Sequence, residues 1–308
     1  ASNNTAVGKS ALAANTTGGR NVAIGEGALL SATTASFNTA VGALAADAIT
    51  TGANNTAIGL QALTAATTSD NNTAVGFQSL LLNTTGAENT AVGSLALDAN
   101  STGANNVAMG HGALSGNTTA SNNTAIGMFG LLSNTTGTNN VAVGTNALND
   151  NTTASNNTSI GKSSSAANTT GSENTVVGAV AFDANTTGSQ NTSVGYGSLS
   201  GNTTASNNTA VGYFALLANT TGEKNTAVGS SAGDAITTGD ENTAVGMSSL
   251  GATTTGGQNT AVGQGSLQVN TTASNNTAVG FSSLNRNTTG TSNTALGRES
   301  LDANTTGD

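Results

Sequence analysis

Few side chains in this chain have the chemistry needed for acid–base or metal catalysis. The 308 residues include one histidine, His111, no cysteine, and only 7% charged residues. A Ser–His pair or a zinc site needs further nucleophilic or ligating groups arranged around the imidazole, and the sequence supplies no such cluster. We therefore expect His111 to be an exposed side chain without a catalytic role. We expect the chain not to be an enzyme and to hold no cofactor or metal.

The carboxylates also do not predict a catalytic or metal site. Five aspartates recur at one equivalent place in a repeated pattern, namely Asp47, Asp98, Asp183, Asp234 and Asp302. The repeats that carry them are three or more units apart, which is at least ~14 Å in a stack of β-strands. Such aspartates cannot form an acid–base pair or share a calcium ion, so we expect them to solvate the surface. The many glycines lack the strand–loop–helix context of a phosphate-binding loop.

Asn-X-Thr, the acceptor pattern for N-glycosylation, is the most frequent candidate modification site. Thirteen asparagines carry it at one equivalent place: Asn15, Asn83, Asn100, Asn117, Asn134, Asn151, Asn168, Asn185, Asn202, Asn219, Asn270, Asn287 and Asn304. Glycans on neighbouring units only ~4.8 Å apart would crowd one another. The other interpretation is a ladder of Asn and Thr side chains that hydrogen-bond from unit to unit. We favour the ladder, with partial glycosylation left open.

All of these residues are placed by one repeat. Asn-Thr-Ala-Val-Gly begins at Asn4 and returns every seventeen residues, eighteen times, without insertion or deletion. A fixed short period is typical of a solenoid, in which each repeat stacks on its neighbours. Residues 1–308 therefore form a single uninterrupted array. Because the chain begins and ends near the end of a repeat, we expect it to be a segment of a longer fibre.

The residues within the repeat favour β-structure. Counting from Asn4 as position 1, position 2 is Thr or Val, position 4 is apolar and position 5 is always Gly. β-Branched residues favour strands, and Asn, Thr, Gly and Val are poor helix formers. Position 9, mostly Leu, is a second apolar anchor, and positions 12–14, mostly Asn-Thr-Thr, predict a second strand. The fold class is thus all-β, a parallel β-solenoid of about 18 coils with two short strands per coil.

Alternation along the first strand predicts its two faces. Position 4 is apolar, so we expect positions 2 and 4 to point inward and positions 1, 3 and 5 to form a flat outer strip. That strip predicts the surface on which another chain lies. Its most regular members are Ala6, Ala40, Ala57, Ala74, Ala91, Ala125, Ala210, Ala227 and Ala244.

Composition excludes two classes of partner. The formal net charge is −9, and six Lys and Arg residues are too few for the basic stripe that nucleic acids require. No apolar run approaches the ~18 residues of a membrane-spanning helix. We expect neither nucleic-acid binding nor membrane insertion. The absence of cysteine excludes disulfides and leaves the redox compartment undetermined.

The repeat resembles a known family. Asn293-Thr-Ala-Leu-Gly-Arg-Glu-Ser-Leu301 is similar to the head repeats of trimeric autotransporter adhesins, whose pattern is Ser-Val-Ala-Ile-Gly followed by a small residue. It also resembles the Asn-Thr-Ala-Val-Gly arrays of phage tail-fibre and large surface-fibre proteins. The resemblance covers all eighteen copies and implies a left-handed β-roll with three chains side by side. The family repeat is shorter, however, and has Val or Ile where this chain mostly has Thr at position 2.

Together these observations predict a structural or adhesive extracellular fibre segment at a cell or virion surface. We expect its main partner to be itself, in a trimer or filament, with host or surface glycans as further candidate partners. A phage tail-fibre shaft is the alternative within this class. An ice-binding solenoid is the alternative from another class, because regular Thr ranks suit ice. We expect only one outward Thr rank, since the position 2 threonines are predicted to point inward.

Overall fold

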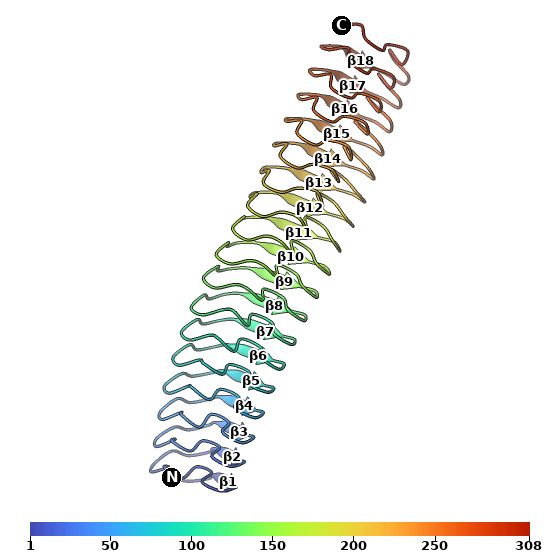
Figure 1. Cartoon of the computed structure of the whole chain (residues 1–308). Coiled ribbons are helices and arrows are strands. Elements are labelled where there is room, and N and C mark those ends of the chain that lie inside the picture. The colour runs from blue at the N-terminus through green and yellow to red at the C-terminus, as the bar shows by residue number, and fades with distance from the viewer. The chain divides into compact units, whose positions relative to one another are not determined.

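The computed structural model describes all residues from Ala1 to Asp308 and contains strands, turns and bends but no helix. The chain forms two compact units, Ala1–Ser155 and Asn156–Asp308. Each unit is a parallel β-solenoid in which one coil takes seventeen residues, as the strand register shows. Figure 1 shows the strands of each unit stacked in sequence order. The prediction of an all-β parallel solenoid with a seventeen-residue repeat is confirmed.

Each coil contributes one three-residue strand at repeat positions 2–4. In the first unit the strands are β1 (Thr5–Val7), β2 (Val22–Ile24), β3 (Thr39–Val41), β4 (Thr56–Ile58), β5 (Thr73–Val75), β6 (Thr90–Val92), β7 (Val107–Met109), β8 (Thr124–Ile126) and β9 (Val141–Val143). In the second unit they are β10 (Thr158–Ile160), β11 (Thr175–Val177), β12 (Thr192–Val194), β13 (Thr209–Val211), β14 (Thr226–Val228), β15 (Thr243–Val245), β16 (Thr260–Val262), β17 (Thr277–Val279) and β18 (Thr294–Leu296).

Strands within a unit pair in sequence order and in register. Thr73 pairs with Thr90, Ala74 with Ala91 and Val75 with Val92, and the same seventeen-residue offset holds in the neighbouring pairs. Because the register never shifts, each repeat position forms a straight rank of equivalent side chains along the unit. The coils are ~4.8 Å apart, the spacing of paired strands.

Positions 12–14 form a bend, so the prediction of a second strand in each coil is wrong. The backbone N–H groups of Thr16 and Thr17 both donate to the carbonyl of Thr33, at 3.0 and 3.1 Å. The Gly18 N–H also donates to this carbonyl, at 3.4 Å. A parallel ladder distributes its N–H groups evenly over successive carbonyls, whereas here consecutive N–H groups converge on one. The segment still joins coil to coil, but it does so without strand geometry.

The turn after each strand uses left-handed backbone at residues other than glycine. In the sixth coil Leu95 and Leu97 have φ values of 58° and 55°, and Asn105, just before the next strand, has a φ of 60°. A left-handed Leu costs of order 1–2 kcal/mol. This conformation turns the Leu97 N–H toward the next coil, where it donates to the Ala113 carbonyl at 2.9 Å. The strand itself ends where two coils approach closely: a Cβ on Gly93 would lie 2.5 Å from the Gly110 carbonyl oxygen.

The interior of each coil has an apolar half and a polar half. In the sixth coil the apolar half contains Ala91, Ala96 and Leu97, all fully buried, and this confirms position 9 as a core anchor. The polar half contains Asn89 and Asn100, whose Nδ2 atoms donate to the same Gly103 carbonyl at 2.8 and 3.0 Å. Two asparagines from opposite sides of the coil therefore meet on one backbone acceptor.

Candidate interaction surface

The structure reverses the predicted orientation of the strand. From β2 to β18 the middle residue of every strand is buried, whereas the first and third are at least partly exposed. Ala91 is 0% exposed, and Met109, at position 4 of the next coil, is 42% exposed. The alanines predicted to form an outer inter-chain strip are therefore core residues: Ala40, Ala57, Ala74, Ala91, Ala125, Ala210, Ala227 and Ala244. Ala6 is exposed together with all of β1, and it faces the same interior side as its equivalents.

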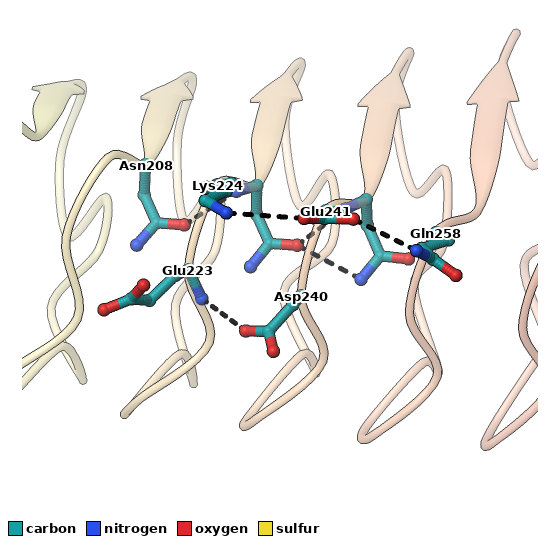
Figure 2. A network of polar contacts seen from close by, with 8 residues as sticks. Asn208, Glu223, Lys224, Asp240, Glu241 and Gln258 are labelled. Carbon is teal, nitrogen blue, oxygen red and sulfur yellow. Dashed lines mark hydrogen bonds and ion pairs between the residues drawn. The ribbon is translucent and has the colours of Figure 1, made fainter.

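The physical reason is that position 1 must point inward. The Oδ1 atom of Asn38 accepts from the backbone N–H of Asn55 at 2.9 Å and from its Nδ2 at 3.1 Å. The Asn55 Nδ2 also donates to the Ser69 carbonyl across the coil at 2.8 Å. Figure 2 shows the same ladder from Asn208 onward. With Asn inside at position 1, alternation places Ala inside at position 3 and leaves Thr and Val outside.

The asparagines of the glycosylation pattern form a second ladder. The Asn100 Nδ2 donates to Asn83 Oδ1 at 2.8 Å and to the Gly103 carbonyl at 3.0 Å, so both of its hydrogens are used. All thirteen acceptor asparagines are buried except Asn15 and Asn304, which are partly exposed. A glycan on Nδ2 of a buried member is incompatible with these hydrogen bonds. The structure thus shows a coil-to-coil ladder at these asparagines, and partial glycosylation stays a prediction.

The outward side chains of positions 2 and 4 form a continuous surface on each unit, which we call the Thr/Val face. Its position 4 members include Ile58, Met109 and Ile126 in the first unit and Val177 and Val228 in the second, all more than a third exposed. No charged residue occurs at position 2 or 4 in any coil, although the chain carries 21 charged residues elsewhere. The hydroxyl groups of the position 2 threonines make no hydrogen bond within the protein. The face is therefore uncharged and regular, with a rank of apolar side chains at position 4 beside a rank of mostly Thr at position 2.

The residues considered for catalysis are not brought together. His111 is exposed, and its ring packs edge-on against Phe129 with centroids 5.3 Å apart. Asp98 and Asp183 each accept a hydrogen bond from a serine hydroxyl of the next coil, at 2.6 and 2.7 Å. No group of three or more His, Cys, Asp or Glu side chains is placed to hold a metal ion.

Two of the position 10 aspartates, Asp47 and Asp234, have shifted pKa values. Burial raises the pKa of the Asp47 and Asp234 carboxyls, and hydrogen bonds from nearby groups oppose the shift. One oxygen of Asp47 is buried without a partner. Both aspartates lie in coils that have Ile in place of Asn at position 12, Ile49 and Ile236. These are local features of two modified coils rather than parts of a shared site.

Charged side chains gather instead at positions 16 and 17, at the edge drawn in Figure 2. Glu241 accepts from Lys224 at 3.4 Å and from Gln258 at 3.1 Å, and these contacts lower the pKa of its carboxyl. Asp240 accepts from the backbone N–H of Glu223 at 2.7 Å. Beside them is an open depression of about 440 Å³, where Gly257 interrupts the rank of position 16 side chains. Exposed pairs of this kind contribute little to stability and leave a solvated edge.

Comparisons of the sequence with known proteins found no match to a protein-family model and no match among curated proteins. No helix of sufficient length and apolarity to cross a membrane is present. The residues of the Thr/Val face were missed at the sequence level because the larger side chain of the strand was assigned to the core. The sequence has no charged residue at position 2 or 4 in any coil. For residues that lie outside, this is the signal that could have identified the Thr/Val face.

Proposed function

We propose that this chain is a non-enzymatic structural segment of an extracellular fibre or adhesin, and that it assembles with copies of itself through the Thr/Val face. The observation that supports this proposal is the uninterrupted rank of apolar position 4 side chains along each unit, every one of them at least partly exposed. Soluble monomers rarely expose a large contiguous apolar surface, and surfaces of this kind mark interaction sites.

The size of the face suits a protein–protein contact. Full burial of a Val or Ile side chain contributes ~1.5–3 kcal/mol, so covering the exposed 40% of Ile126 contributes roughly 1 kcal/mol, and covering the less exposed members contributes less. Repeated over the coils of one unit, this reaches about 5–10 kcal/mol, which is the scale of the entropic cost of association. A contact over the whole length of a unit is therefore needed, and short contacts are too weak.

A second copy of the chain is the partner that fits this surface best. The Thr and Val ranks repeat at every coil, and a surface with the same period matches them over many coils at once. The chain carries a net charge of −9, yet the face has no charge, so two copies can approach there without like-charge repulsion at the contact. The resemblance to adhesin heads and phage fibres favours a cell-surface or virion location, and a tail-fibre shaft is a variant of the same proposal.

Lysine substitutions on the face test this proposal. The test variant is Val75→Lys/Val92→Lys/Ile126→Lys, and the control is Thr85→Lys/Thr102→Lys/Thr136→Lys, at the exposed position 14 of the same coils. Both add the same charge at outward positions, so circular dichroism should show both folded. In sedimentation velocity and electron microscopy, we expect the face variant to weaken assembly at least 100-fold and the control by less than about threefold. Equal effects, or a wild-type chain that stays monomeric at high concentration, contradict the proposal.

One observation favours ice binding as a second candidate. The position 2 threonines point outward with free hydroxyls, and the exposed position 14 threonines form another outward rank. Each unit therefore has two outward Thr ranks, whereas the sequence predicted only one. A regular Thr/Val surface orders water in a way that an irregular one does not. Thermal hysteresis of dilute protein tests this candidate. A freezing-point gap that disappears in Thr73→Lys/Thr90→Lys supports it, and the absence of any gap removes it.

A further inference from the structure

An aromatic cluster interrupts the second unit at the corner beside the Thr/Val face. Tyr196 and Tyr213 occupy position 6 of consecutive coils, and their rings are stacked with centroids 5.8 Å apart and planes 14° apart. Phe214 lies against both, with its centroid 4.0 Å from that of Tyr213 and 5.6 Å from that of Tyr196. Each tyrosine is 52% exposed, and neither hydroxyl makes a hydrogen bond within the protein.

The cluster depends on a specific backbone feature. Phe214 fits because the equivalent residue of the preceding coil is Gly197, where an added Cβ would lie 2.5 Å from the Phe214 ring. Phe214 itself has a left-handed backbone with φ of 55°. The ring packs under the two tyrosines and limits their rotamers, so the exposed aromatic surface is held in place before any ligand arrives.

The surroundings are small and polar. Position 6 of the flanking coils is Ala179 on one side and Ser230 on the other, so no bulky side chain of that rank covers the outer ring faces. Ser231 follows Phe214 in the position 7 rank, and its N–H donates to the Tyr213 carbonyl at 2.9 Å. Its side chain is near Asp234 and lowers the pKa of that carboxyl, against the larger effect of burial, which raises it. The corner therefore combines exposed apolar ring surface with hydroxyl and carboxylate groups.

We propose that the corner formed by Tyr196, Tyr213 and Phe214, with Ser231 and Asp234 beside it, binds a pyranose ring of a neutral saccharide. A sugar ring presents C–H groups on its faces and hydroxyls at its rim. The former pack on aromatic rings, and the latter donate to carboxylate and tyrosyl oxygens. Asp234, beside the corner, and Asp183, in the coil before Tyr196, carry negative charge and disfavour anionic sugars. The corner lies within one unit and does not require a second copy of the chain.

The same construction occurs in the first unit with different side chains, and this supplies a comparison. There His111 and Gly112 precede Met128 and Phe129, and an added Cβ on Gly112 would lie 2.9 Å from the Phe129 ring. This corner keeps the partly buried Phe but replaces both tyrosines and has Asn149, rather than an aspartate, at position 10 of the following coil. We expect it to bind neutral saccharides much more weakly.

Intrinsic fluorescence gives a selective readout, because Tyr196 and Tyr213 are the only tyrosines and the chain has no tryptophan. The full chain is titrated with cellotetraose, maltotetraose and chitotetraose, and with a sulfated tetrasaccharide as the anionic arm. We expect at least one neutral probe to change the emission saturably and the sulfated probe not to do so. Calorimetry on Tyr196→Ala/Tyr213→Ala should then show at least a tenfold loss of affinity, and Phe77→Ala/Phe281→Ala, which removes exposed aromatics elsewhere, should bind as the wild type does.

Several results overturn the proposal. They are the absence of saturable binding by every neutral probe, undiminished binding in the double tyrosine variant, and preference for the sulfated probe. An emission change that depends on protein concentration alone would assign the corner to contact with another copy of the chain. Because saccharide binding and self-association are measured separately, either can fail without the other.

Discussion

Breaking the buried asparagine ladder at Asn100 should destabilise its coils by a predictable amount. Asn100→Ala removes the hydrogen bonds to Asn83 Oδ1 at 2.8 Å and to the Gly103 carbonyl at 3.0 Å. It also removes the bond accepted from the Asn117 Nδ2 at 3.0 Å. Gly103 keeps its bond from Asn89, whereas Asn83 Oδ1 is left buried without a partner. At about 1 kcal/mol per bond, the expected cost is about 3 kcal/mol.

Local hydrogen exchange is the appropriate assay, because a stack of repeats does not unfold as one two-state unit. A loss of about 3 kcal/mol corresponds to roughly 100-fold faster exchange in peptides covering residues 83–117. Thr102→Ala, at an exposed position of the same coil with no side-chain hydrogen bond, is the control and should change exchange less than about threefold. If Asn100→Ala matched the Thr102→Ala control, the ladder would not be a main stabilising element and the reasoning would be refuted.

Further predictions concern packing and charge. Gly233→Leu should overpack, since an added Cβ lies 3.0 Å from Ile236 Cδ1, and Ile236→Asn should leave a cavity. The double variant has Leu at position 9 and Asn at position 12, as most other coils do, and should recover about 2 kcal/mol relative to the sum of the two single variants. Additive effects on hydrogen exchange in peptides covering residues 225–241 would contradict this compensation. For Asp234, burial raises the carboxyl pKa above its ordinary value of 3.8, so the folded state is favoured below that pH and loses this advantage as pH rises through the raised pKa. Asp234→Asn should therefore be more stable than the wild type at pH 7 and no more stable below pH 3.8, as measured by thermal melts; a difference independent of pH would contradict the assignment.

The period, the all-β class and the buried Leu rank were predictable from sequence, because each depends on spacing and on a residue type that strongly prefers burial. Leu97 is in the core as expected. The orientation of the strand was not predictable by the same rule. Hydrophobicity favoured Val92 over Ala91 for the interior, but the ladder of Asn89 and its equivalents determines the inward side. Buried Asn is favourable here only because each amide finds partners in its own coil and in neighbouring coils, which a single repeat does not reveal.

The second strand was mispredicted for a related reason. Thr-Thr pairs have high strand propensity, yet Thr16 and Thr17 share one acceptor in the next coil and form a bend. The left-handed conformation of Leu97 was also outside the reach of propensity, since Leu normally avoids it. In both cases bonds between coils override local preference. The exposed Thr/Val face follows from these facts. Because Ala91 and Ala125 are fully buried, Ala91→Lys or Ala125→Glu should disrupt the folding of its coil.

The central claim is that copies of the chain meet through the Thr/Val face, and hydroxyl-radical footprinting of the unmodified protein tests it most directly. Oxidation of exposed side chains is followed by mass spectrometry in dilute and concentrated samples. Met109 and Val228 report on position 4 of the face, and Leu82 and Val269, exposed at position 11, report on a different side of the coil. We predict at least fivefold slower oxidation of Met109 and Val228 in the assembled sample, with Leu82 and Val269 unchanged. Protection of Leu82 and Val269 while Met109 and Val228 stay reactive would contradict the claim.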